Sequence, residues 1–391
     1  MVAERRASLF REKAERGHHR VTFVELFFDL VFVFAVTQLS HKLLGNFTDV
    51  GILETALLLL AVWWVWMYTS WITNWLDPER TPVRLMLFVL MLAGLALTTS
   101  IPKAFESRGL VFALAYAGMQ VGRTAFMQFA IDRDDLVLRQ NFARIQVWLS
   151  VAGLLWLGGG LSQGGVRLAF WTGALIIEYV GPAARFWTPL HGAANVSDWT
   201  IEGGHLAERC ALFIIIALGE SVLVTGATFA DHEWSAPAIT AFTAAFTGTI
   251  AMWWIYFDKA AEVGVEQITH ARDPGRLGRL AYTYLHLPIV AGIILSAVGD
   301  ELVLAHPLGH TEAKAVASVV GGPVAYLIGV ILFKRTVRGW FQLSHQIGIA
   351  ALLVLAGCGR FVSPLVLTIA TSAVLVIVAI WETVSLRTRT G

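Results

Sequence analysis

Long apolar runs, separated by short stretches that hold most of the charge, constrain this sequence more than any other feature. Twelve runs are each about 20 residues long, which is the length that an α-helix needs to cross a bilayer. A helix satisfies its own backbone hydrogen bonds, so each run is expected to be helical in lipid. Only 15% of the residues are charged, against about 25% in soluble domains. The sequence therefore predicts an all-α polytopic membrane helix bundle with about twelve transmembrane helices.

The expected spans are bounded by charged residues, Pro or Gly. The first six cover residues 22–44, 51–75, 83–101, 109–131, 142–161 and 166–187. The second six cover residues 205–230, 236–258, 277–298, 313–333, 341–360 and 364–384.

The positions of Lys and Arg predict how the chain is oriented. If the N-terminus is cytoplasmic, 22 of the 29 Lys and Arg residues fall in inner segments, six fall in outer segments, and Arg123 lies within a span. Positive residues gather on the cytoplasmic side of membrane proteins. An even number of spans returns the chain to its starting side, so both termini are predicted to be cytoplasmic. The first twenty residues are polar, which does not fit a cleaved signal peptide.

The two halves of the sequence share short motifs in the same order. The second span contains WWVWMY from Trp63, the eighth contains WWIYFD from Trp253, and the third and ninth spans both begin with Arg-Leu. Units of six helices share one orientation, which predicts two parallel six-helix repeats related by an axis along the membrane normal. The expected organisation is a cytoplasmic tail (1–20), a first repeat (21–190), a cytoplasmic linker (191–204) and a second repeat with a short cytoplasmic C-terminal tail (205–391).

Charged residues inside the apolar runs are the candidate functional residues. An ionised side chain at the bilayer centre costs about 2.5–3.5 kcal/mol, so such residues are expected to meet partners inside the bundle. In the first repeat, Glu25 and Asp29 lie one turn apart on the first span. Arg123 and Glu178 are expected at a depth similar to that of Asp29, and Glu178 and Arg185 are expected on one face of the sixth span.

The seventh span provides the candidates of the second repeat. His205, Arg209 and Glu220 share a face, Glu208 is nearby, and Glu220 falls near the membrane centre. For Arg123 and Glu178, a neutralised pair that joins helices and a functional role are both open. For Glu25 and Asp29 the sequence favours function, because two carboxylates one turn apart leave one charge in excess. For Glu220 it also favours function, because no cation is evident at the depth of this residue.

Several classes of site are not indicated by the sequence. Cys210 and Cys358 lie inside apolar runs, and no CxxC, metal-ligand motif, phosphate-binding loop or nucleophile elbow is present. The net charge of +1 does not show the excess of basic residues that is typical of proteins that bind nucleic acid. We therefore expect no cofactor, no metal and no nucleic-acid partner. The expected partners are the lipid bilayer and an unknown small solute or ion, such as a proton or a monovalent cation, and the sequence leaves a homo-oligomer open.

Several of these segments resemble one known family. VELFFDLVFVFAVTQLSHKL, WWVWMYTSWITNWLDPER, LALTTSIPKAF and LAERCALFIIIALGESVLVTGATF look like signatures of the bacterial low temperature requirement protein A family. The resemblance covers nearly the whole chain and implies a polytopic protein of the bacterial inner membrane, named for growth in the cold, without a settled transport activity. It implies signature positions at Glu25, Asp29, Glu208 and Glu220.

The first span has a second, more local resemblance. FFDLVFVFAVTQL is similar to the Phe-Ser-Asp signature of the endolysosomal potassium and proton channel family, which is also built from six-helix repeats. This chain has Phe28 in place of the Ser, Leu30 in place of the Gly, and Ala211 where the repeated Asp would be expected.

Three functional hypotheses follow. The favoured one is a transporter or channel for a small solute or ion, in which carboxylates on one helix face carry a proton or coordinate a cation. The first alternative is a scaffold or stress protein that transports nothing, which fully paired charges would favour. The second is an intramembrane enzyme acting on lipid or quinone, for which His205, Glu208 and Glu220 would be the candidate catalytic residues. We expect the protein not to be an enzyme.

Overall fold

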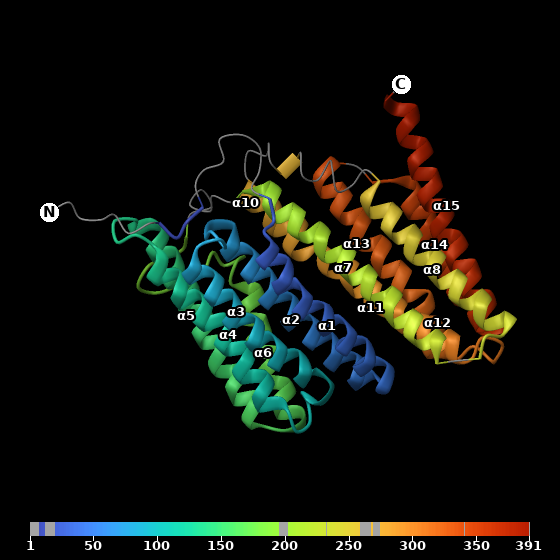
Figure 1. Cartoon of the computed structure of the whole chain (residues 1–391), viewed down its shortest axis with the longest axis horizontal. Coiled ribbons are helices and arrows are strands. Elements are labelled where there is room, and N and C mark those ends of the chain that lie inside the picture. Colours follow the sequence, from blue (N-terminus) through green and yellow to red (C-terminus); the bar gives the residue numbers. More distant parts are fainter. Residues whose placement is uncertain are drawn as a thin grey trace. The chain divides into compact units, whose positions relative to one another are not determined.

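The computed structural model describes residues 8–11, 20–194, 202–231, 233–258, 267–268, 274–339 and 341–390. Within these residues, the regular secondary structure is helical, apart from two isolated β-bridges (Figure 1). The first eight helices are α1 (Phe23–Gly45), α2 (Asp49–Trp75), α3 (Thr81–Ser100), α4 (Gly109–Ala130), α5 (Leu136–Leu161), α6 (Gly164–Val180), α7 (Gly203–Ala230) and α8 (Ala236–Phe257). The later ones are α10 (Pro274–Leu277), the π-helical η3 (Gly278–Tyr284), α11 (His286–Ala305), α12 (Ala313–Val319), α13 (Gly321–Arg338), α14 (Leu343–Cys358) and α15 (Pro364–Thr390).

The helices have the length and composition of membrane spans. Among the described residues, eleven helical stretches are long and apolar enough to cross a membrane, counting α10 to α11 and α12 to α13 as one stretch each. The predicted span that is not among these eleven is the sixth, and it corresponds to α6, whose 17 residues meet the lower limit of length for a span. The predicted all-α polytopic membrane bundle is confirmed.

The outward faces of the helices are apolar, unlike those of a soluble protein. On α3, the side chains of Leu85, Val89, Leu92 and Leu95 are 57%, 67%, 71% and 46% exposed. Their spacing of three or four residues puts them on one face of the helix. A continuous apolar face of this kind is suited to lipid and would promote association in water.

Residues at the helix ends satisfy backbone groups that the helices leave unpaired. The side chains of Thr48, Asp135 and Ser235 each accept a hydrogen bond from a backbone N–H in the first turn of α2, α5 and α8. At the other end of α13, Gly339 adopts φ of 87°, the left-handed conformation in which glycine commonly ends a helix. Local sequence thus sets several of the boundaries.

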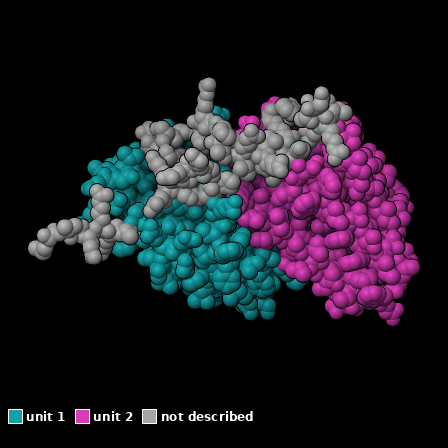
Figure 2. Space-filling model, turned by 45° about the horizontal axis from the view of Figure 1, so that its top comes forward, with its two compact units in different colours: residues 1–42, 48–206, 273–276 teal, residues 43–47, 207–272, 277–391 magenta. Residues whose placement is uncertain are grey.

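The chain forms two compact units, each with its own packed interior (Figure 2). Unit 1 contains residues 1–42, 48–206 and 273–276, and in it α4 packs against α3, α5 and α2, while α6 packs against α5 and α2. Unit 2 contains residues 43–47, 207–272 and 277–391, and in it α11 packs against α12 and α13, α8 against α15, and α14 against α13 and α15. The internal repeat and its domain boundaries stay predictions.

The predicted sixth span is too long. Helix α6 ends at Val180, and a series of turns follows in place of the helix expected up to residue 187. Pro182 has no N–H to donate to the carbonyl of Glu178, and Arg185 and Phe186 have φ of 53° and 47°. Arg185 therefore does not continue the helical face of Glu178, as the sequence had suggested.

Two predicted spans of the second half also differ from the structure. The ninth was expected to end at residue 298, but α11 continues to Ala305 and so includes Asp300. The tenth is interrupted at Val320, between α12 and α13. The sequence Gly-Gly-Pro from Gly321 explains the interruption, because glycine and proline both disfavour a helix interior.

Candidate functional site

A buried carboxylate on α6 forms the centre of a polar cluster in unit 1. Glu178 is 2% exposed and accepts hydrogen bonds from the hydroxyl of Tyr116, from Nε1 of Trp156 at 3.2 Å and from Nε2 of Gln120 at 3.5 Å. Tyr116 and Gln120 lie on α4, and Trp156 lies on α5. The hydrogen bonds to this carboxylate therefore come from neutral side chains on two helices. Trp156 was not identified from sequence as a partner of Glu178.

Arg123 is close to this cluster but does not form an ion pair with Glu178. Its guanidinium donates to the carbonyl of Val65 at 3.1 Å, to Oγ1 of Thr69 at 2.8 Å and to Oε1 of Gln120. Its Nε has no hydrogen-bond partner among the described residues. Gln120 thus links the two charged groups, donating to Glu178 and accepting from Arg123. The direct ion pair between Arg123 and Glu178 that the sequence left open is therefore not formed, and Gln120 bridges the two side chains.

Asp29 is anchored to the same turn of α2 that Arg123 contacts. The carboxylate is completely buried, and its Oδ1 accepts a hydrogen bond of 2.7 Å from Nε1 of Trp66. Trp66 directly follows Val65, whose carbonyl accepts from Arg123. The structure therefore brings Asp29, Arg123 and Glu178 together around the middle of α2, as their expected depths had suggested.

Glu25 belongs to a separate cluster of unit 1. Its carboxylate lies 3.1 Å from NH2 of Arg11 and 3.0 Å from Nε2 of His205, and it accepts from both the backbone N–H and the hydroxyl of Thr22. Nδ1 of His205 lies 3.4 Å from Nδ2 of Asn74. Glu25 is completely buried, and its charge faces a cation, so this cluster resembles the neutralised arrangement more than the Glu178 cluster does.

The predicted cytoplasmic tail contributes to this cluster. Nε of Arg11 donates to the carbonyl of Thr73 at 2.8 Å, and Phe10 forms a β-bridge with Leu76. The described residues 8–11 are therefore packed against the end of α2 and do not form a free tail. The remaining residues of 1–19 lie outside the described part of the chain.

The other predicted residues lie along α7 in unit 2. Arg209 is completely buried, Glu220 is 8% exposed, and Glu208 is half-buried. Arg209 and Glu220 are therefore both buried along one helix, and their functional role stays a prediction.

Two polar groups of unit 2 were missed from sequence. Nζ of Lys334 lies 2.7 Å from Oε1 of Glu382, and Nε2 of His345 lies 3.8 Å from the other oxygen of that carboxylate. The position of Glu382 inside the last apolar run could have indicated this ion pair from sequence. The second group surrounds Asp300, which was placed outside its helix because the ninth span was expected to end too early. Among the described residues, no group of three or more His, Cys, Asp or Glu side chains is arranged to hold a metal ion.

Comparisons with known proteins agree with the resemblance seen in the sequence. The profile of the bacterial low temperature requirement A protein (LtrA) family matches residues 20–380. An uncharacterized protein of Rhizobium meliloti (strain 1021), RA0937, is 40% identical over 377 residues, which cover 96% of this chain and 92% of that protein. No solved structure matches this chain.

Proposed function

This multi-pass membrane protein belongs to the bacterial low temperature requirement A family, and from that premise we propose that it is a transporter or channel for a proton or small cation. The pathway that we propose runs through unit 1 past Asp29 and Glu178, with Glu220 as the corresponding carboxylate of unit 2. We assign the protein to a bacterial inner membrane, with both termini in the cytoplasm.

The single observation that carries this proposal is the environment of Glu178. A buried carboxylate that only joined helices would be expected to pair directly with a cation, because an uncompensated buried charge is strongly destabilising. Glu178 instead receives hydrogen bonds from neutral Tyr116, Trp156 and Gln120. The side chain of Gln120 lies between this carboxylate and the guanidinium of Arg123. This arrangement leaves the carboxylate able to exchange its proton, or to meet a passing cation, without breaking an ion pair.

Asp29 also accepts a hydrogen bond from a neutral side chain. Its Oδ1 accepts from the indole of Trp66, which is a neutral donor, and it lies in the first-span signature that the family resemblance pointed to. We assign Glu25 a different role. Its carboxylate faces Arg11 and His205, so we propose that it fixes the N-terminal segment and the start of α7 in unit 1.

A scaffold that transports nothing is the alternative with a specific observation in its favour. Lys334 and Glu382 form a close buried ion pair in unit 2, which is the kind of contact that holds helices together. We propose a structural role for that pair and a transport role for the cluster of unit 1. An enzymatic function is not proposed.

Flux measurements test the proposal. The purified protein would be reconstituted in liposomes that contain a pH-sensitive or cation-sensitive dye. We expect flux above that of empty liposomes, and we expect Glu178→Gln, Asp29→Asn and Glu220→Gln each to lower it to the background. Each substitution removes a charge and keeps the shape of the side chain, so insertion should be unchanged.

The matched control is Glu312→Gln. The side chain of Glu312 is 64% exposed and pairs with Lys314 at the surface, so this substitution should leave flux unchanged. Wild-type flux that persists at full size in the Glu178→Gln protein would refute the assigned pathway. Absence of flux for protons and for each alkali cation tested would favour the scaffold.

A further inference from the structure

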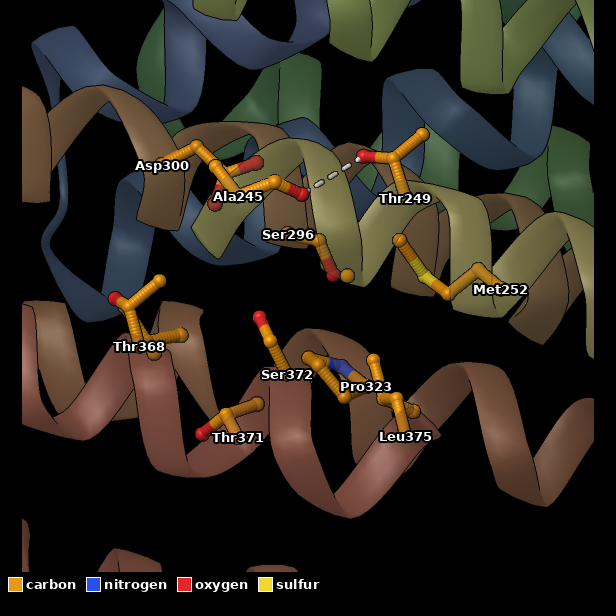
Figure 3. Close-up of a pocket in the computed structure, with 12 residues that line it drawn as sticks. Ala245, Thr249, Met252, Ser296, Asp300, Pro323, Thr368, Thr371, Ser372 and Leu375 are labelled. Carbon is orange, nitrogen blue, oxygen red and sulfur yellow. Dashed lines mark hydrogen bonds between the residues drawn. The ribbon is translucent and has the colours of Figure 1, made fainter. Parts of the chain in front are cut away.

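A small cavity inside unit 2 brings together five hydroxyl groups and one carboxylate among apolar residues. It lies between α8, α11 and α15, next to the break between α12 and α13 (Figure 3). Its volume is about 20 Å³, which is enough for one occupant of the size of a water molecule. The residues that line it are Ala245, Gly248, Thr249, Met252, Ser296, Asp300, Val319, Pro323, Thr368, Thr371, Ser372 and Leu375.

Three of the hydroxyls have no hydrogen-bond partner. Ser296, Thr368 and Thr371 are 7%, 3% and 3% exposed, and the Oγ atom of each has no partner among the described residues. A buried hydroxyl left in this state costs about 1–3 kcal/mol. Three such groups around one cavity therefore indicate that an occupant supplies the missing interactions.

Two further hydroxyls present oxygen lone pairs to the cavity. Thr249 donates its hydrogen to the carbonyl of Ala245 at 3.3 Å, a bond drawn as a dashed line in Figure 3, and Ser372 donates to the carbonyl of Ala244 at 2.8 Å. With their hydrogens used in this way, both groups can act only as acceptors toward an occupant. This favours a positively charged ligand over an anion.

Asp300 supplies a negative charge to the same cavity. It lies one turn after Ser296 on α11, is half-buried, and makes no hydrogen bond or ion pair with any described part of the chain. Of the described residues that line the cavity, it is the one with a charge. A carboxylate among apolar helices is costly unless a cation or hydrogen-bond donors compensate it.

The helix break leaves a backbone carbonyl next to the cavity without its usual helical donor. In a continuous helix, residue 323 would donate its N–H to the carbonyl of Val319, but Pro323 has no N–H. Both residues line the cavity. Interrupted helices in membrane proteins are commonly found where freed backbone groups contact a bound ion.

We propose that this cavity is a binding site for one monovalent metal cation of the size of sodium. Oxygen atoms are the ligands that hard cations prefer, and a single carboxylate balances a single positive charge. The space of about 20 Å³ fits one occupant of the size of a water molecule or a bare ion. A water molecule would satisfy the hydroxyls, whereas a cation would also balance the charge of an ionised Asp300, and for this reason we assign a cation to the cavity. This site is independent of the carboxylate pathway proposed for unit 1.

Thermal stability measured against cation concentration tests the site. The full-length protein would be purified in detergent without alkali cations, and sodium chloride would replace choline chloride at constant ionic strength. A ligand that binds the folded state stabilises it in proportion to the logarithm of its concentration, so we expect Tm to rise with sodium and not with choline. Binding of radioactive sodium should saturate at one ion per chain.

Substitutions in the cavity assign the effect to this site. We expect Asp300→Asn to abolish both the sodium-dependent rise of Tm and the binding of radioactive sodium, while Glu312→Gln retains both. If Asp300→Asn does not fold, Ser296→Ala and Thr371→Val provide the test. Each removes one oxygen ligand and should weaken the apparent affinity for sodium about tenfold.

Two outcomes would overturn the proposal. The first is equal Tm of the wild-type protein in sodium, lithium, potassium and choline, which would mean that the cavity holds water alone. The second is unchanged sodium binding in folded Asp300→Asn, which would place the ion elsewhere. Sodium binding without flux in liposomes would refute transport and support the site, so the two proposals can fail separately.

Discussion

At the scale of single residues, the buried charges form two kinds of arrangement. Glu25 with Arg11, and Glu382 with Lys334, each face a cation at hydrogen-bonding distance. Glu178 is instead held by neutral donors. The first kind gains its stability from attraction between opposite charges, so its two members depend on each other. The second kind receives its hydrogen bonds from neutral groups in place of a cation, and this difference underlies the roles that we propose.

The Lys334–Glu382 pair gives a prediction at this scale. Removing one partner of a buried ion pair leaves the other charge uncompensated and costs about 3–5 kcal/mol, whereas replacing both with apolar residues is often close to neutral. We therefore expect Lys334→Met to lower Tm in detergent strongly. The double variant Lys334→Met with Glu382→Leu should recover most of the loss. A double variant that is less stable than Lys334→Met would contradict a structural role based on charge pairing.

At the scale of the helices, close backbone contact defines the packing of α11 against α13. A Cβ atom on Gly292 would lie 2.5 Å from the backbone nitrogen of Tyr326 and 2.7 Å from the carbonyl oxygen of Gly322. Backbone atoms of two packed helices do not yield to such a contact, so glycine is required here for the approach of the two helices. Small residues play this role widely in membrane helix pairs.

Substitution of Gly292 tests this contact. We expect Gly292→Ala to destabilise the protein by about 1–3 kcal/mol, the usual range for overpacking, through separation of α11 from α13. Gly357→Ala on α14 is the matched control, because a Cβ atom there meets nothing within 4 Å, and alanine should be neutral or stabilising. Thermal unfolding in detergent would measure both. Equal stability of the two variants would argue against close contact at Gly292.

At the scale of the whole molecule, the number of crossings decides the topology. The described residues contain eleven helical stretches with the character of spans and the shorter α6. If α6 also crosses the membrane, the total is even and the termini lie on the same side. The concentration of Lys and Arg in alternate segments then predicts that both termini lie in the cytoplasm.

Cysteine labelling in cells tests this topology. Cys210 and Cys358 would first be replaced by alanine, and single cysteines would then be placed at His310, between α11 and α12, and at Asp134, between α4 and α5. Both positions are exposed. We expect an impermeant thiol reagent applied outside to label His310→Cys and not Asp134→Cys, and fluorescent protein fusions at both termini to report the cytoplasm. Termini on opposite sides of the membrane would mean that one helix, first of all α6, does not cross.

The sequence by itself determined that this chain is a bundle of membrane helices, where most of those helices lie, and several of the carboxylates that are buried in them. These properties depend on the local hydrophobicity and the length of each apolar run. An apolar run in lipid must satisfy its own backbone hydrogen bonds, and a helix does so. Asp29, Glu178 and Glu220 could be chosen for the same reason, since charges are few in such runs.

Only the tertiary structure decided which groups meet. The bridging of Arg123 to Glu178 by Gln120, the contact of His205 with Glu25, and the gathering of Asp300 with hydroxyls from α15 all join residues far apart in the chain. Helical periodicity gives the face on which a residue lies, but the neighbour of that face depends on how helices pack. The end of α6 and the break before α13 also changed which residues could meet. Pro and Gly interrupt a helix at these points, so the chain beyond them runs in a different direction from a continued helix.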